Sequence, residues 1–489
     1  MKWVAYNLLF LLVYPFLLPG FLLRMLRRGG YAKRFGDRFA LYPKDLFGAN
    51  RGIFDRHAPV TKHQTPVTKH QAPGTSFVWI HAVSVGEVQV AGQLMREWRR
   101  AEPEVRFCFS TTSSTGWKMA EREVTERDVL IYNPLDFPNF VKSALYTVRP
   151  RAIILTESEI WPNFILRAKK LGIPLFLINA RVSDRSAPRY KLAKFFFGDV
   201  FRSFTRIFAQ SELDKARLVA AGAPADRTDV TGSFKFDVAH RNEAKEKELR
   251  EWIRGRMKNE ELRMKNEELG VKNEELGAKN GCRILLGGST WPGEDEVLLK
   301  IYKKLLDGRA NNSLVLVIAP RHFEKADAVE ANIRAAGFAC IRRSRGDEPR
   351  SAGGRETEDG RREVFLADTT GELMGLYGIA DVVFVGKSLC AHGSQNMIEP
   401  CLCGKPTFVG PYTENFRPVM SDLLEGEGIV QVKDAAELEE KVVEAFATLE
   451  GRGADASPLK GLGARAAAAV ERRCGVVPRC VTAIREAIR

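Results

Sequence analysis

The feature that most constrains this chain is an alternation of short apolar runs with helix-length segments. The runs are rich in Val, Ile and Leu, which is typical of strands buried on both faces of a parallel sheet. They are FVWI at Phe77, RFCFS at Arg106, AIILT at Ala152, PLFLIN at Pro174, RIFAQ at Arg206, TDVTG at Thr228, RILLGG at Arg283, LVLVIAP at Leu314, VVFVG at Val382 and PTFVG at Pro406.

These runs fall into two groups, separated near residues 240–280. The pattern predicts an α/β protein with two Rossmann-like domains that face a cleft. In open parallel sheets, ligands bind at the carboxyl ends of the strands. We therefore look for functional residues where each predicted strand ends.

The net charge of +14 over 489 residues indicates an anionic partner: nucleic acid, anionic lipid or a phosphorylated ligand. The basic motifs interleaved with aromatic residues that mark RNA-binding modules are missing, so no nucleic-acid partner is expected. The cysteines are scattered and form no CxxC pair. This spacing favours reduced thiols in a cytoplasmic compartment over a disulfide framework or a zinc site.

The N-terminal segment Trp3–Leu23 carries no charge and has the length of about 20 residues that can span a bilayer. Only Lys2 precedes it, whereas a basic stretch follows, with Arg24, Arg27, Arg28, Lys33 and Arg34. By the positive-inside rule, the body of the protein is then cytoplasmic. Pro15 and Pro19 leave a kinked, partly embedded anchor as the alternative. In both cases the basic stretch is expected to lie against an anionic membrane surface.

Two tandem repeats have a period of seven: PVTKHQT and PVTKHQA within 59–72, and MKNEELR, MKNEELG and VKNEELG within 257–277. Met257, Leu262, Met264 and Leu269 lack the spacing of three and four that a coiled-coil seam needs, so we interpret both repeats as solvated insertions. The predicted organisation is a membrane-anchor helix (1–28), an N-terminal domain (29–240) with a repeat insertion (57–75), a linker with the second repeat (241–280), a C-terminal domain (281–460) and C-terminal helices that pack back towards the N-terminal domain (461–489).

Polar residues follow several predicted strands of the N-terminal half. Ser84 and Glu87 have the spacing of a capping box, and the alternative for Glu87 is a general base at the helix start. Glu157 is either a helix cap or a site residue. The stretch with Asn179 and Arg181 is either a polar loop or a grip on an anionic acceptor. Lys235 is either solvated or placed to neutralise a phosphate.

The C-terminal half carries similar strand ends. Arg321 directly follows a strand and suits a phosphate or a base. Gly371 precedes a predicted helix whose start offers free N–H groups to an anion. Asn396 and Glu399 are three residues apart and so lie on one helix face. The Glu399 carboxylate can accept hydrogen bonds from both hydroxyls of a ribose. Each motif taken alone also fits a loop or a cap.

Together the stretches HAVSVGEV, ESEIWPN, NARVSDRS, TGSFKFD, APRHFEK, TTGEL and GSQNMIEP resemble the 3-deoxy-D-manno-octulosonic acid (Kdo) transferases, in order and in spacing. The resemblance implies a GT-B glycosyltransferase with an acceptor-binding N-terminal domain and a nucleotide-binding C-terminal domain. Such enzymes transfer Kdo from CMP-Kdo to the lipid A precursor (lipid IVA) in lipopolysaccharide biosynthesis, at the cytoplasmic face of the inner membrane.

The resemblance also implies roles for single residues. Glu87 is the general base of an inverting single displacement, and Glu157 and Lys235 stabilise the transition state. CMP is bound by Pro320, Arg321, Gly371, Glu372, Leu373, Asn396, Met397, Ile398 and Glu399. Ser84, Gly86, Asn179 and Arg181 are candidates for acceptor binding. The chain departs from the family pattern at Trp291, where a histidine is common, and at Ser394, Gln395, Met397 and Ile398.

No metal or other cofactor is expected, because CMP carries a single phosphate that a helix start and cations can stabilise, and no Asp-x-Asp spacing occurs. Two alternatives remain. One is another membrane-associated GT-B enzyme that uses a UDP-sugar, such as the N-acetylglucosaminyltransferase of peptidoglycan synthesis. The other is a non-catalytic membrane-anchored scaffold that binds lipid.

Overall fold

The computed structural model describes residues 2–4, 6–8, 10–13, 16, 20, 34–43, 46–47, 77–237, 242–254, 283–307, 314–346, 362–451 and 457–489. Both heptapeptide repeats and much of the predicted anchor lie outside these residues. The chain forms two compact units, the first of Met1–Val238 with Gly475–Arg489 and the second of Ala239–Cys474. The described cysteines are free thiols.

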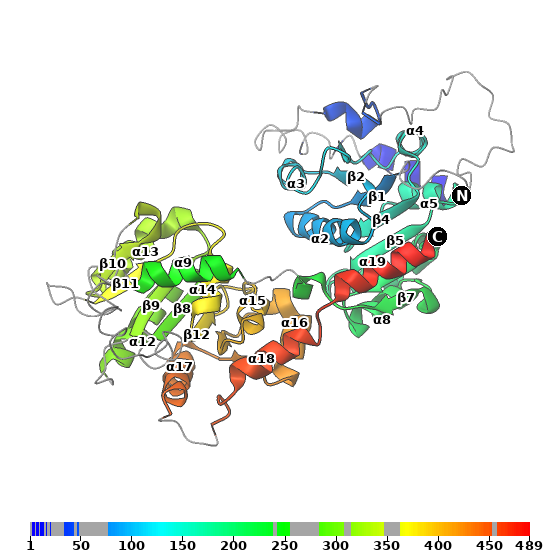
Figure 1. The fold of residues 1–489 in the computed structure, drawn as a ribbon. Coiled ribbons are helices and arrows are strands. Elements are labelled where there is room, and N and C mark those ends of the chain that lie inside the picture. The colour runs from blue at the N-terminus through cyan, green and yellow to red at the C-terminus, as the bar shows by residue number, and fades with distance from the viewer. Residues whose placement is uncertain are drawn as a thin grey trace, which may run out of the picture. The chain divides into compact units, whose positions relative to one another are not determined.

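The first unit is built on a seven-stranded sheet in the order β3-β2-β1-β4-β5-β6-β7 (Figure 1). Every pair of neighbouring strands is parallel. The strands are β1 (Phe77–His81), β2 (Arg106–Thr111), β3 (Val129–Tyr132), β4 (Ala152–Thr156), β5 (Leu175–Ala180), β6 (Arg206–Ala209) and β7 (Thr228–Val230).

Helices cover both faces of this sheet, which explains why its strands are apolar throughout. Trp79 of β1 packs against Phe164 of α5 (ring centroids 5.0 Å apart) on one face, while Val78 and Ile80 pack towards α2 and α19 on the other. The helices of this unit are α2 (Val85–Ala101), α3 (Ser114–Ala120), α4 (Pro138–Val148), α5 (Pro162–Lys170), α6 (Ala187–Leu192), α7 (Lys194–Phe201), α8 (Glu212–Ala220) and α19 (Val476–Ala487).

The second unit repeats this plan with the strand order β10-β11-β9-β8-β12-β13-β14, again all parallel. Its strands are β8 (Arg283–Thr290), β9 (Leu314–Pro320), β10 (Ala339–Arg342), β11 (Glu363–Leu366), β12 (Val382–Val385), β13 (Thr407–Val409) and β14 (Val430–Gln431). Its helices are α9 (Glu243–Arg254), α12 (Glu294–Asp307), α13 (Ala326–Ala335), α14 (Leu373–Ile379), α15 (Ile398–Leu402), α16 (Arg417–Glu425), α17 (Ala435–Leu449) and α18 (Leu462–Glu471).

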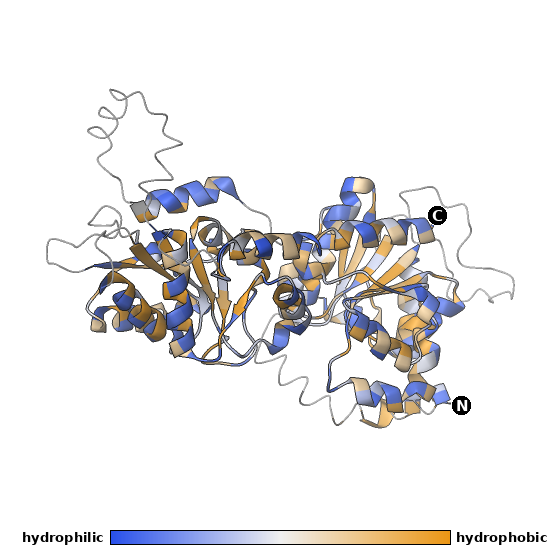
Figure 2. Ribbon diagram, turned by 90° about the horizontal axis from the view of Figure 1, so that it is seen from below, coloured by the Kyte–Doolittle hydropathy of each residue, from blue (hydrophilic) through white to orange (hydrophobic). Residues whose placement is uncertain are grey.

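Hydropathy follows these layers in both units: the strands are hydrophobic, and the helices carry hydrophilic residues on their outer faces (Figure 2). The prediction of two parallel-sheet, Rossmann-like α/β domains is therefore confirmed. All the apolar runs identified in the sequence contain strands, whereas β3, β10, β11 and β14 were not predicted.

The described residues of the N-terminal segment are helical and pack on the first unit. The ring of Trp3 lies 4.6 Å from that of Phe196 in α7, and the Tyr6 hydroxyl donates a hydrogen bond to Asp136 (3.2 Å). Among the residues described here, no helix combines the length and the apolar character that crossing a membrane requires.

Candidate active site

The first sheet brings two predicted site residues to its topological switch point. Strand order reverses between β1 and β4, and a ligand of an open parallel sheet binds at such a point. Glu87 lies in the first turn of the helix that follows β1, and Glu157 directly follows β4. The two carboxylates therefore reach the same place on the carboxyl edge of the sheet.

Glu87 forms the capping box that the sequence predicts. Its N–H donates to the Ser84 hydroxyl (3.3 Å), and that hydroxyl donates to Glu87 Oε1 (2.8 Å). Glu87 Oε2 accepts from the Val83 N–H (3.0 Å) and from the Thr156 hydroxyl (3.1 Å). Three donors thus hold a carboxylate that is only 8% exposed. A carboxylate has about four acceptor sites, so this geometry leaves room for a substrate hydroxyl.

Glu157 is the centre of a charged cluster. Its Oε2 accepts from Arg181 Nε (2.7 Å), and its Oε1 accepts from the Asn179 amide (3.3 Å). Burial raises the pKa of the Glu157 carboxyl, the Glu87 charge adds to that rise, and the positive charges of Arg181 and Lys235 oppose it. The four charged residues of this cluster therefore lie within electrostatic reach of one another.

The backbone at this edge is strained. Glu157 and Asn179 both have a φ of 51°, in the left-handed region that few L-residues adopt. Asn179 is fully buried and holds the strained segments together: its side-chain oxygen accepts from the Phe234 N–H (3.1 Å), and its carbonyl accepts from Gln210 (2.9 Å). Asn179 thus positions Glu157. Gly86, another residue predicted to bind the acceptor, borders open space, because no described atom lies within 4 Å of where its Cβ would be.

The segment that carries Lys235 is fixed from a distant part of the chain. Lys235 lies in a 3₁₀ turn (Phe234–Asp237), and the Asp237 carboxylate accepts from the N–H groups of Gly475 and Val477 (2.7 Å each) at the start of α19. Helix α19 in turn packs on α2, the helix of Glu87. Thr156 and Asp237 were not predicted from the sequence, because nothing local marks them as partners of the site.

In the second unit, strand order reverses between β8 and β12. The Asn396 amide donates to Glu399 Oε1 (2.9 Å), and the Ile398 N–H donates to the side-chain oxygen of Asn396 (3.1 Å). Burial raises the pKa of the Glu399 carboxyl, while the Asn396 hydrogen bond and the positive charge of Arg321 oppose the rise. Arg321, directly after β9, therefore lies within electrostatic range of Glu399 in α15.

Most of the other residues predicted to bind the nucleotide can contact it only through their backbone groups. The Glu372 carboxylate accepts from Arg343 (3.0 Å) and from Lys245 (3.2 Å), so it is engaged with its own unit. Met397 and Ile398 are fully buried. Gly371 is exposed with a φ of 86° and precedes the start of α14.

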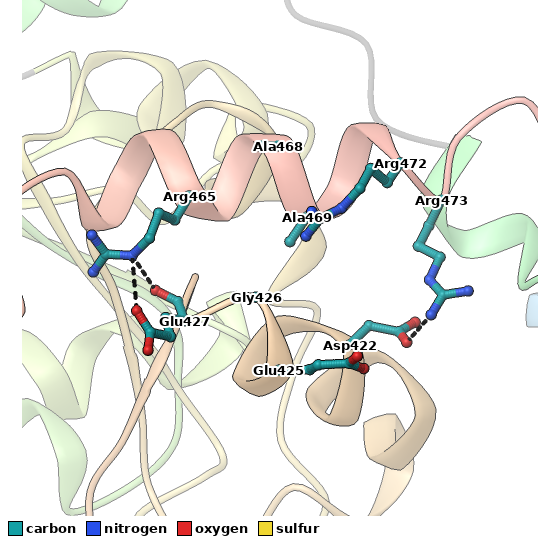
Figure 3. A pocket seen from close by; sticks show the side chains of 9 residues that line it. All are labelled: Asp422, Glu425, Gly426, Glu427, Arg465, Ala468, Ala469, Arg472 and Arg473. Atoms are coloured by element: carbon teal, nitrogen blue, oxygen red, sulfur yellow. Dashed lines mark hydrogen bonds and ion pairs between the residues drawn. The ribbon is translucent and has the colours of Figure 1, made fainter.

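Figure 3 shows a separate hollow between α16 and α18. Arg465 points towards Glu427 and Arg473 towards Asp422, and each pair forms an ion pair. None of the predicted site residues lines this hollow, so we do not include it in the candidate active site. Within the described part of the chain, no group of three or more His, Cys, Asp or Glu residues is arranged to hold a metal ion.

Comparison with known proteins shows similarity to one family model, two relatives and one solved structure. Residues 33–238 match a family model described as 3-deoxy-D-manno-octulosonic-acid transferase (kdotransferase). The 3-deoxy-D-manno-octulosonic acid transferase of Haemophilus influenzae is 30% identical over 90% of both chains, and that of Bordetella pertussis is 32% identical over 73% of this chain and 76% of its own. A glycosyltransferase structure from Rickettsia africae shares the fold, with a TM-score of 0.50, 12% identity and coverage of 85% of this chain and 99% of its own.

Proposed function

Because the chain belongs to the Kdo transferase family and is thus a glycosyltransferase, we propose that it transfers Kdo from CMP-Kdo to the lipid A precursor (lipid IVA). This reaction is a step of lipopolysaccharide biosynthesis. The observation that carries the proposal is the charged cluster of Glu87, Glu157, Arg181 and Lys235 at the switch point of the first sheet. Such a cluster supplies a base and cations in one partly buried place.

In the proposed mechanism, Glu87 accepts the proton of the acceptor hydroxyl as that oxygen attacks the anomeric carbon of Kdo. The bond from this carbon to the CMP phosphate breaks with its electron pair, CMP departs, and the configuration inverts. Lys235 offsets negative charge that develops on the departing phosphate. Glu157, held by Arg181 and Asn179, orients the cation cluster.

For the donor, we propose that Arg321 contacts the phosphate and Glu399 the ribose hydroxyls, with backbone groups of Gly371–Leu373 beside them. Support comes from the effect of the Arg321 charge on Glu399 and from the open space around Gly371 before the start of α14. Because CMP carries one phosphate, cations and N–H groups suffice, so the transfer is proposed to be independent of metal.

Incubation of the purified chain with CMP-Kdo and a tetra-acylated lipid A precursor tests the function, with mass spectrometry of the product. We expect a mass increase of one or more Kdo units, at the same rate with and without EDTA. Loss of the activity in EDTA and its recovery with Mg²⁺ would contradict metal independence. Protection against thermal unfolding by UDP but not by CMP would favour the UDP-sugar alternative.

We propose that the chain acts at the inner membrane with both units on the cytoplasmic side. On the first unit, Leu192 and Phe195 of α6 and α7 are 89% and 80% exposed, and Lys191 and Lys194 beside them are exposed as well. Lys2 of the N-terminal segment donates to the Phe195 carbonyl (3.0 Å), so this surface continues onto that segment. Exposed apolar side chains among lysines suit an anionic bilayer.

Replacing both Leu192 and Phe195 by Glu is expected to weaken binding to vesicles with anionic phospholipid about tenfold or more, since two apolar side chains are then no longer transferred from water into the bilayer. Co-sedimentation of the full chain with vesicles measures the effect. Leu424→Glu, at an exposed leucine of the second unit, is the matched control and is expected to bind normally. Unchanged binding of the double variant would mean that the N-terminal segment alone carries the association.

A further inference from the structure

Two loops of the second unit lie next to each other at its topological switch point. Trp291 follows β8, and Lys387 follows β12, the strands between which the order reverses. The ammonium group of Lys387 lies 5.0 Å from the centre of the Trp291 ring, within the range of a cation–π contact. Ligands of open parallel sheets bind at this point, so these side chains lie where a ligand is expected.

A buried carboxylate fixes the backbone of both loops. Glu294, which is fully buried, accepts hydrogen bonds from the N–H groups of Trp291 (2.8 Å), Lys387 (2.8 Å) and Ser388 (3.1 Å). The two loops can approach this closely because residue 386 is a glycine: a Cβ at Gly386 would lie only 2.5 Å from the Thr290 Cα. The loops therefore form one rigid support for the two side chains.

Lys387 occupies a position that favours glycine. Its φ is 56°, in the left-handed region, where most L-residues are disfavoured. The residue is partly buried, and within the described part of the chain no carboxylate forms an ion pair with its ammonium group. A lysine held in a strained backbone without an acidic partner at a ligand-binding edge has its charge available for an anion.

Arg321 provides a second cation in the same place. It follows β9, the other neighbour of β8, and its N–H donates to the Thr290 carbonyl (3.0 Å), directly before Trp291. The charge of Arg321 acts on Glu399. Arg321 thus belongs to the nucleotide side of the site, whereas Lys387 lies on the β12 loop.

We propose that Lys387, positioned by Trp291, binds the carboxylate of the donor sugar. This inference rests on the proposed function. CMP-Kdo carries two fixed anionic groups, the phosphate and the sugar carboxylate. The segments after β9 and β12 offer one cation each, Arg321 and Lys387. A donor with a neutral sugar would present no carboxylate to Lys387.

The test compares the substrate with the product that lacks the sugar. Lys387→Gly removes the ammonium group and suits the backbone, and it is expected to raise the KM for CMP-Kdo about tenfold, the value of a charged hydrogen bond. Inhibition by CMP, which has the phosphate but no sugar carboxylate, is expected to change less than twofold. This inhibition also reports that the variant is folded.

Three further variants sharpen the test. Lys387→Arg keeps a cation and is expected to keep the KM within about threefold of wild type. Trp291→Phe keeps an aromatic ring and is expected to affect the KM less than Trp291→Ala. Lys325→Gln removes the other lysine near the Trp291 ring (5.8 Å from its centre), on the exposed turn after β9, and is expected to change the KM less than twofold.

An unchanged KM in Lys387→Gly would overturn the proposal. If Lys387→Gly weakened inhibition by CMP as much as it raised the KM for CMP-Kdo, Lys387 would be assigned to the phosphate, and the proposal would also be overturned. If Lys325→Gln raised the KM as much as Lys387→Gly does, the effect would come from the overall positive charge of this surface and not from Lys387, which would overturn the proposal too. A wild-type protein that binds CMP but transfers no sugar would overturn the proposed function and this inference with it.

Discussion

Glu87→Gln is expected to lower the rate of Kdo transfer by a factor of about 10²–10⁴, the usual contribution of a general base. Glutamine keeps the size of the side chain, and its oxygen still accepts from Val83 or Thr156, which hold the carboxylate in the wild type. It has no basic carboxylate to receive the proton of the acceptor hydroxyl. The loss is therefore expected in kcat, with thermal stability nearly preserved.

Initial rates with saturating CMP-Kdo, together with the melting temperature, measure this effect. Glu97→Gln is the matched control, because it makes the same change on the same helix at a residue that pairs with Arg100 on the surface. If Glu87 served only as a helix cap, Glu87→Gln would lower the melting temperature and leave the rate close to that of the control. That result would remove Glu87 from the mechanism.

Lys235→Met is expected to reduce kcat about a hundredfold or more, because one positioned charge is lost from a partly buried site. Lys235→Arg is expected to keep much of the activity, since the positive charge remains. Lys118→Met, at an exposed lysine of α3, is the control and is expected to be fully active. Equal rates of Lys235→Met and this control would contradict the role of Lys235.

The pH dependence of these variants separates charge from packing. Burial lowers the pKa of Lys235, and the charge of Glu157 opposes that change. The charged form is complete below this lowered pKa and is lost as the pH rises through it, so the wild-type rate is expected to fall on the alkaline side. In Lys235→Arg the fall is expected at higher pH, because a guanidinium stays protonated. Identical alkaline limbs would show that Lys235 does not set the profile.

The interior strands were predictable because strands with helices on both faces are buried over their whole length. β1 and β4, for example, have no exposed residue. Three of the missed strands, β3, β10 and β14, are edge strands, and β10 and β14 are mostly half-exposed, so their sequences lack the continuous apolar run. β11 begins with a charged residue, Glu363, which is buried in the structure.

The site was predictable in part for the same reason. A parallel strand delivers its last residues to one edge of the sheet, so Glu87, Glu157, Lys235 and Arg321 were identified from their places after apolar runs. The partners that hold them were not predictable. Thr156 reaches Glu87 only because β1 and β4 are neighbours, and Asp237 meets α19 across more than two hundred residues of chain.

The amino-acid sequence by itself determined two parallel α/β units and the residue types at their carboxyl edges, because burial on both faces and the direction of a strand are local properties. Which strand ends are neighbours within each sheet was decided only by the tertiary structure. Strand order placed Glu157 beside Glu87 and Lys387 beside Trp291, and it did so through hydrogen bonds between segments that are distant in the chain.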